Sequence, residues 1–208
     1  MRLAPEGRPF IAGAAIFTAV CWVSAPVWTA LLFSAVTLWV AAFFRDPERP
    51  GPRGDDLVLA PADGKVVSVV TVDEPKFVQE RTTRVSIFMN VFNVHVNRYP
   101  ASGTVAFREY LPGRFGHAAT DKASVENEQS SIGLLTPRGR MLVRQIAGLV
   151  ARRIVTDHDV GTPVRQGERM GIIRFGSRVD VFLPLGARVL VHPGEKTRAG
   201  VTVVARWD

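Results

Sequence analysis

A long apolar run near the start of the chain limits the fold more than any other feature. No charged side chain occurs between Phe10 and Phe44. As one helix, at about 1.5 Å per residue, this run would measure about 52 Å, against a hydrocarbon core of about 30 Å. Ser24-Ala25-Pro26 divides it into halves of about 15 to 18 residues, near the usual minimum for a span. We therefore expect a helical hairpin or two shallow membrane helices, with one strongly tilted helix as the alternative.

The flanks of the run indicate whether it stays in the protein and how it is oriented. Val23-Ser24-Ala25 resembles a signal-peptidase site, but Pro26 follows directly and the apolar run continues beyond it. We therefore expect a retained anchor rather than a cleaved signal peptide. Arginines lie on both sides of the run, and its central turn is uncharged. By the positive-inside tendency, both ends of a hairpin lie in the cytoplasm.

Charge and cysteine content limit the classes of partner and metal site that the chain can have. The formal net charge is +7, which suits nucleic acid or anionic lipid, and the apolar anchor favours lipid headgroups over nucleic acid. Cys21, the single cysteine, lies inside the apolar run, so an internal disulfide and a cysteine metal site are excluded. The spacing of His117, His158 and His192 is not typical of metal ligands. No metal is expected.

The remainder of the chain reads as one β domain behind a linker. Arg45 to Asp56 is rich in proline, glycine and charge, as in a linker, and the domain begins near Leu57. Short alternating or β-branched runs separated by turn signals then predict a mainly β (α+β) fold, a single β-sandwich or barrel-sandwich-like domain. These runs span residues 57–59, 65–72, 84–88, 95–97, 103–107, 131–136, 141–146, 169–175, 179–183, 188–191 and 202–205.

A Gly-Ser bond inside one of the strand-like stretches is a candidate for self-cleavage. The stretch from Arg174 to Pro184 alternates in polarity, and Gly176 has no side chain to block a nucleophile from its carbonyl. A Gly-Ser pair in a strand is ordinarily a bulge or turn. The Gly176-Ser177 bond therefore gains weight only from other motifs.

Three further motifs accompany it. They are Pro61-Ala62-Asp63-Gly64-Lys65-Val66, Phe92-Asn93-Val94-His95-Val96-Asn97-Arg98-Tyr99-Pro100 and Asp121-Lys122-Ala123-Ser124-Val125-Glu126-Asn127-Glu128. In this order, and with the Gly-Ser site, they resemble the phosphatidylserine decarboxylase proenzymes of the short bacterial and archaeal type. The resemblance covers about residues 45 to 208. Longer family members often carry Gly-Ser-Thr or Gly-Ser-Ser, whereas Arg178 follows Ser177 here, so help from a second hydroxyl is not implied.

The resemblance implies that the chain makes its own cofactor. The Ser177 hydroxyl attacks the Gly176 carbonyl and forms an ester, and β-elimination and hydrolysis then leave a pyruvoyl group at residue 177. The products are a β chain of residues 1–176 and an α chain of residues 177–208, both within one β domain. His95 takes the serine proton, and Asp63 holds the second nitrogen of its ring. Without the family, His95 would read as a structural strand histidine and Asp63 as a turn residue.

The same resemblance implies the reaction and the partners. The pyruvoyl carbonyl forms a Schiff base with phosphatidylserine, carbon dioxide leaves, and His95 protonates the carbanion to give phosphatidylethanolamine. Arg98, Arg114 and Lys122 are candidates to bind the phosphate. The expected location is the inner membrane of a bacterial cell, with the catalytic domain on the cytoplasmic side and anionic lipid as partner. A homodimer is compatible with the sequence.

Three alternatives stay open at this point. The first is a membrane-tethered serine hydrolase that uses Asp63, His95 and Ser177, although the Gly-x-Ser-x-Gly elbow of one hydrolase class is absent. The second is a non-enzymatic, lipid-binding β domain in which Gly176-Ser177 is a bulge. The third is a pyruvoyl decarboxylase of a soluble amino acid, which the apolar anchor disfavours.

Overall fold

The computed structural model describes residues 2–113, 127–148, 153–174 and 177–207. The chain forms two compact units, Met1–Glu48 and Arg49–Asp208. The boundary falls inside the expected linker. From Arg49 onward that segment is fixed to the second unit, because Arg53 Nη1 donates to the Gly200 carbonyl at 3.0 Å and the Gly54 amide donates to Gln166 Oε1 at 3.0 Å.

The first unit is a helical hairpin. A 3₁₀ turn η1 (Pro5–Gly7) leads into α1 (Arg8–Ser24), and α2 (Val27–Phe43) follows after a turn at Ala25 and Pro26. β1 (Arg2–Leu3) pairs with β2 (Arg45–Asp46), so the two ends of the hairpin are joined. Proline cannot continue a helix from the preceding turn, which explains the break. The expected hairpin is therefore seen, and the single tilted helix is not.

Hydrogen bonds between the two helices use the few polar side chains of the run. Thr18 Oγ1 lies 2.8 Å from Thr37 Oγ1, and Trp22 Nε1 donates to Ser34 Oγ at 3.1 Å. Large apolar side chains point outward, among them Val23 at 90% exposure and Leu38 at 72%. Within the described residues, Pro5–Ser24 is long and apolar enough to cross a membrane, while Val27–Phe43 is slightly shorter.

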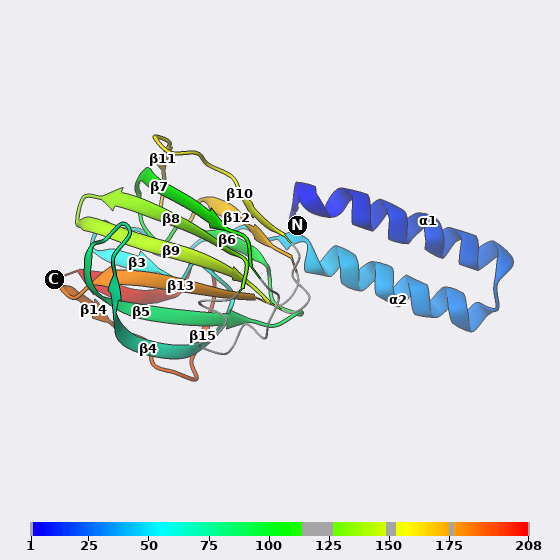
Figure 1. Ribbon diagram of the computed structural model, residues 1–208. Helices are drawn as coiled ribbons and strands as arrows, with labels where there is room; N and C mark the ends of the chain where they lie inside the picture. Colours follow the sequence, from blue (N-terminus) through cyan, green and yellow to red (C-terminus); the bar gives the residue numbers. More distant parts are fainter. Residues whose placement is uncertain (1, 114–126, 149–152, 175–176, 208) are drawn as a thin grey trace. The chain divides into compact units, whose positions relative to one another are not determined.

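The second unit consists of three antiparallel sheets (Figure 1). The main sheet has eight strands in the order β11 (Pro163–Val164), β7 (Gly103–Leu111), β8 (Gln129–Thr136), β9 (Gly139–Ala147), β13 (Ser177–Pro184), β5 (Glu80–Met89), β4 (Gly64–Glu74) and β15 (Lys196–Thr197). A second sheet is formed by β10 (Ile154–Thr156), β12 (Arg169–Ile173) and β6 (Val96–Arg98). The third contains β14 (Ala187–Val189), β16 (Val203–Trp207) and β3 (Leu57–Leu59).

The main sheet is curled, and its inner face holds the largest core. Alternate residues of each strand point to that face, for example Val179, Val181 and Leu183 of β13. They pack with side chains of the two smaller sheets, such as Val58 and Met170. The outer face has a second, smaller apolar cluster of Phe77, Val78, Leu142 and Phe182. Both faces of β13 are therefore covered.

The expected mainly β fold is confirmed, and each of the eleven predicted runs overlaps a strand. The runs were predicted too short in most cases, since strand ends such as Gly64 and Gln129 carry no apolar alternation. In the second unit, β10, β11 and β15 were not predicted. β11 and β15 have two residues each, which is too few for a period-2 pattern.

Candidate active site

Ser177 is the first residue of the central strand of the main sheet. It pairs with Met89 of β5 on one side and with Ala147 of β9 on the other. Its side chain is fully buried, and Oγ donates to the Met89 sulfur at 3.4 Å. A thioether is a weak acceptor and not a base, so this contact orients the hydroxyl without activating it. The nucleophile candidate is thus fixed in position and needs a separate base.

His95 lies directly before β6 and is also fully buried. Its Nδ1 is 3.0 Å from the carbonyl oxygen of Asn93. A carbonyl oxygen only accepts, so Nδ1 carries the hydrogen and Nε2 is the nitrogen that can take up a proton. The local turn therefore fixes the tautomer that a general base requires.

Side-chain contacts bring the histidine segment and the serine into one buried region. Asn97 lies two residues after His95, on the same side of the strand, and its Nδ2 donates to the Met89 sulfur at 3.6 Å. Met89 is thus a shared neighbour of Asn97 and Ser177. Gln145 Nε2 of β9 donates to Asn97 Oδ1 at 2.8 Å, which holds the amide in place.

A main-chain hydrogen bond also places His95 near Ser177. The amide of Ile173, the last residue of β12, donates to the His95 carbonyl at 3.4 Å. Ser177 follows four residues later, so its Cα lies at most about 14 Å from that of Ile173 even if the chain is fully extended. The base candidate and the nucleophile candidate therefore occupy the same end of the fold.

Asp63 has other partners than the expected one. Its Oδ2 accepts from Arg49 Nη2 at 2.6 Å, and its Oδ1 accepts from the Ala199 amide at 2.7 Å. Within the described parts of the chain, a hydrogen bond from His95 to this carboxylate is not seen. Asp63 leads into β4, which is one strand further from β13 than β5 is, and its turn faces Ala199. The Asn93 carbonyl, rather than Asp63, holds His95 Nδ1.

Comparison with known protein families identifies the family to which the chain belongs. A model of the family "Phosphatidylserine decarboxylase" matches residues 36–205. The chain belongs to the phosphatidylserine decarboxylase family. A relative named phosphatidylserine decarboxylase proenzyme, from Symbiobacterium thermophilum, is 48% identical over 205 residues, with 98% of this chain and 95% of the relative covered.

Two other phosphatidylserine decarboxylase proenzymes give the same picture. The protein from Cupriavidus pinatubonensis is 47% identical over 208 residues, with 99% of this chain and 95% of the relative covered. The protein from Magnetococcus marinus is 48% identical over 211 residues, with 98% of this chain and 94% of the relative covered. The similarity thus includes the apolar hairpin as well as the β domain.

The other residues predicted for this phosphatidylserine decarboxylase family member are placed only in part. Gly176, Arg114 and Lys122 lie outside the described residues. Arg98 is half-buried, and its Nη1 donates to the Gly167 carbonyl at 3.1 Å. This hydrogen bond holds the turn before β12.

Three residues of the site were not singled out from the sequence. Asn97 belongs to a motif quoted for the family resemblance, yet nothing in the motif distinguished it from its neighbours. Gln145 gives a signal that was overlooked, because it is the one polar residue among the inward positions Met141, Val143 and Ala147. Met89 gives none, since a methionine at a strand end reads as ordinary core.

Tyr99 follows β6 and lies beside the start of β12, at the opposite end of that strand from the His95 contact. Its side chain is buried, and its hydroxyl lies 3.2 Å from His158 Nδ1, while His158 Nε2 is 3.7 Å from Glu168. Burial, followed by the negative charges of Asp157 and Glu168, raises the pKa of the tyrosine above its usual range. The neutral phenol form of Tyr99 is therefore favoured.

Proposed function

We propose that this chain converts phosphatidylserine to phosphatidylethanolamine and carbon dioxide. Family membership over nearly the whole chain supports the proposal, and so does the printed name of its relatives. The observation that carries it is the position of Ser177. This serine begins a central strand at a Gly-Ser bond, is fully buried, and lies in the same region as a histidine whose tautomer is fixed.

The proposal includes self-cleavage between Gly176 and Ser177. His95 Nε2 takes the proton of the Ser177 hydroxyl, the oxygen adds to the Gly176 carbonyl carbon, and the C–N bond breaks to give an ester and a free amine. Loss of the Ser177 Cα proton and of the Cβ–Oγ bond releases the Gly176 carboxylate. Water then replaces the nitrogen as ammonia, and residue 177 becomes a pyruvoyl group. The chains produced are 1–176 and 177–208.

The surroundings of Ser177 fit this cofactor. The conversion removes Oγ with the Gly176 carboxylate and turns Cβ into a methyl group. Met89 accepts a hydroxyl weakly in the uncut chain and packs equally well against a methyl, because a thioether is apolar and polarisable. When present, the pyruvoyl group acts as the electron sink for decarboxylation.

The protein side chains have separate tasks in this proposal. His95 serves first as base and later as the acid that returns a proton to the substrate carbon. Asp63, bound to Arg49 and the Ala199 amide, supports the site through the turn that starts β4. Arg98, Arg114 and Lys122 bind the lipid phosphate.

The location proposed is the cytoplasmic face of a bacterial inner membrane. The hairpin Arg8–Phe43 presents apolar side chains to lipid, and arginines flank it. Anionic lipid then supplies the substrate at the surface next to the anchor. The α and β chains are partners within one folded domain, and a homodimer is compatible with this arrangement.

The first experiment is the intact mass of the purified protein under denaturing conditions, with Ser177→Ala as control. We expect two chains divided between Gly176 and Ser177, the smaller with a pyruvoyl mass, and a single chain in the control. Decarboxylation is then measured with phosphatidylserine vesicles and with free serine. An uncut chain that reacts with a serine-directed probe would indicate the hydrolase instead, and an uncut, inert chain would indicate a lipid-binding domain.

A further inference from the structure

Two opposite charges lie buried on the outer face of β13, directly after Ser177. Arg178 is 1% exposed and Asp180 is fully buried. They are two residues apart, so their side chains point to the same face. Arg178 Nε and Nη2 donate to the two carboxylate oxygens of Asp180, each at 2.8 Å. We call Arg178 and Asp180 the β13 charge pair.

The β13 charge pair continues into the neighbouring strand. Asp180 lies directly opposite Arg144 of β9. Arg144 Nε donates to Ser131 Oγ at 3.1 Å, and its guanidinium lies 4.9 Å from the centre of the Phe182 ring. Arg144 is therefore fixed by contacts on both sides, and positive and negative charges alternate across the outer face.

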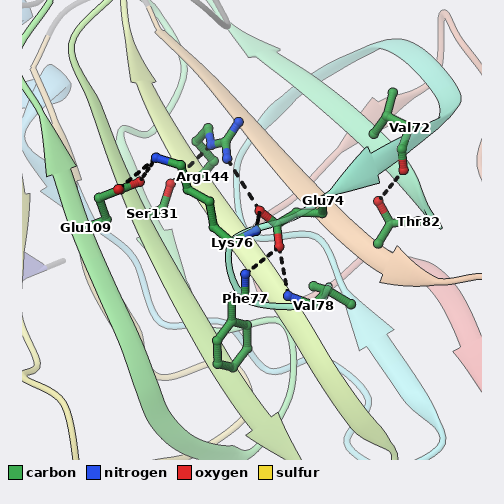
Figure 2. Close-up of polar contacts among 9 residues, drawn as sticks. All are labelled: Val72, Glu74, Lys76, Phe77, Val78, Thr82, Glu109, Ser131 and Arg144. Carbon is green, nitrogen blue, oxygen red and sulfur yellow. Dashed lines mark hydrogen bonds and ion pairs between the residues drawn. The ribbon is translucent and has the colours of Figure 1, made fainter. Parts of the chain in front are cut away.

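Glu74, the last residue of β4, completes the series. Its carboxylate is 4.0 Å from Arg144 Nη2 and accepts the amides of Phe77 and Val78 at 2.9 and 2.7 Å (Figure 2). Burial lowers the pKa of Arg144, while the negative charges of Asp180 and Glu74 act in the opposite direction. The charges belong to three separate elements of the sheet.

Stability alone does not explain a buried ion pair in this position. Removing two charges from water costs about as much as their attraction returns, and apolar residues of similar volume often serve as well. In a strand, the more specific effect of such a pair is on register. The two faces of β13 differ in how well they define the register of this strand.

The inner face of β13 defines register poorly. Val179, Val181 and Leu183 are all aliphatic and all buried in the same core. A slip of one residue would move them to the outer face, but a slip of two would replace one aliphatic side chain with another. The apolar pattern therefore permits slips of two residues.

The outer face excludes such slips. In the observed register, Asp180 faces Arg144, and Ile146 and Leu142 flank that position on β9. A slip of two residues in either direction would place the Asp180 carboxylate opposite one of these aliphatic side chains. In one direction it would also place Arg178 opposite Arg144, so that a buried and a partly buried positive charge would meet.

We propose that Arg178 and Asp180, paired against Arg144, are positioning residues that fix the register of β13 and so hold residue 177 opposite Met89 and Ala147. The role rests on the proposed function. Before the cut, a fixed register holds the Ser177 hydroxyl within reach of the carbonyl that it attacks and of His95, the base that takes its proton. The role applies more strongly afterwards, because residue 177 is then a chain end without a covalent tether, and strand ends fray.

The test removes both charges together. The double variant Arg178→Met, Asp180→Leu keeps similar volumes and leaves Arg144 with Glu74. We expect its melting temperature to stay within about 4 °C of the parent, because a well-packed apolar replacement is close to neutral. We expect both the rate of cutting and the decarboxylation per cut chain to fall by about 10- to 100-fold, as for misplaced reacting groups.

Lys76 and Glu109 supply the matched control, because they form an ion pair on the same face but are partly exposed (Figure 2). Lys76→Met with Glu109→Gln should change neither the rate of cutting nor the decarboxylation per cut chain by more than about 2-fold, as expected for a surface pair. The single variant Asp180→Leu should melt well below the double variant, since it leaves Arg178 buried without that carboxylate.

The outcomes separate this role from the proposed function. A parent protein that is not cut would overturn the proposed function and this role with it. If the parent is cut and the double variant matches it in both cutting and decarboxylation, the β13 charge pair has no positioning role. A double variant that loses activity and also melts more than about 4 °C below the parent would overturn the role as well, because it would show that the pair acts on stability only.

Discussion

At the scale of single residues, His95 is the side chain on which the proposed chemistry depends most. We expect His95→Ala to slow self-cleavage by about 100- to 10,000-fold, the usual contribution of a general base. The chain should remain folded, since the ring is replaced by a smaller apolar side chain. The measurement is the fraction of cut chain over time on a denaturing gel. His192→Ala, which alters an exposed histidine, is the control and should cut normally.

Asp63 is the residue for which geometry and expectation differ most. Asp63→Asn keeps an acceptor for the Ala199 amide but removes the charge facing Arg49, whose side chain is 4% exposed. We expect a loss of about 1 to 3 kcal/mol in the free energy of unfolding. Urea titration of the uncleavable Ser177→Ala background measures it.

The same substitution in the cleavable protein should slow cutting far less than His95→Ala does. A loss of cutting as severe as that of His95→Ala would instead support a direct Asp63–His95 contact during the reaction. Such a result would restore the serine–histidine–aspartate arrangement inferred from the sequence.

At the scale of elements, the hairpin has an apolar outward face, as the proposed membrane anchor requires. Ile16 of α1 and Leu31 of α2 are 67% and 56% exposed. Changing both to lysine should weaken insertion by about 2.5 to 3.5 kcal/mol for each charge placed near the bilayer centre. We expect the protein to shift from the alkali-resistant membrane pellet to the supernatant. Val160→Lys, an exposed position of the β domain, should leave the protein in the pellet.

The elements also show how far sequence reasoning reaches. The hairpin break and the eleven strand-like runs were predictable, because Pro26 and period-2 alternation act locally. The partner of each strand was not, since β13 lies between β9 and β5, which are distant in the chain. For the same reason Ser177 could be named, but its contact with Met89 and the partners of Asp63 could not.

At the scale of the whole molecule, the Gly176-Ser177 bond divides the β domain very unevenly. The segment after it supplies β13 in the middle of the main sheet, β15 at the edge of that sheet, and β14 and β16 in another sheet. Neither piece has a closed core without the other. The cut that we propose must therefore follow folding.

Under the proposed self-cleavage, this interweaving makes maturation irreversible. An uncut chain refolds as a single body, whereas a cut enzyme must reassemble from two molecules, and its short piece cannot form a core alone. We expect Ser177→Ala to recover its circular dichroism after dilution from urea, and the cut enzyme to recover activity poorly and only at high concentration. Full recovery at nanomolar concentration would contradict this. Each enzyme molecule is then assembled once, and loss by unfolding is made good only by new synthesis.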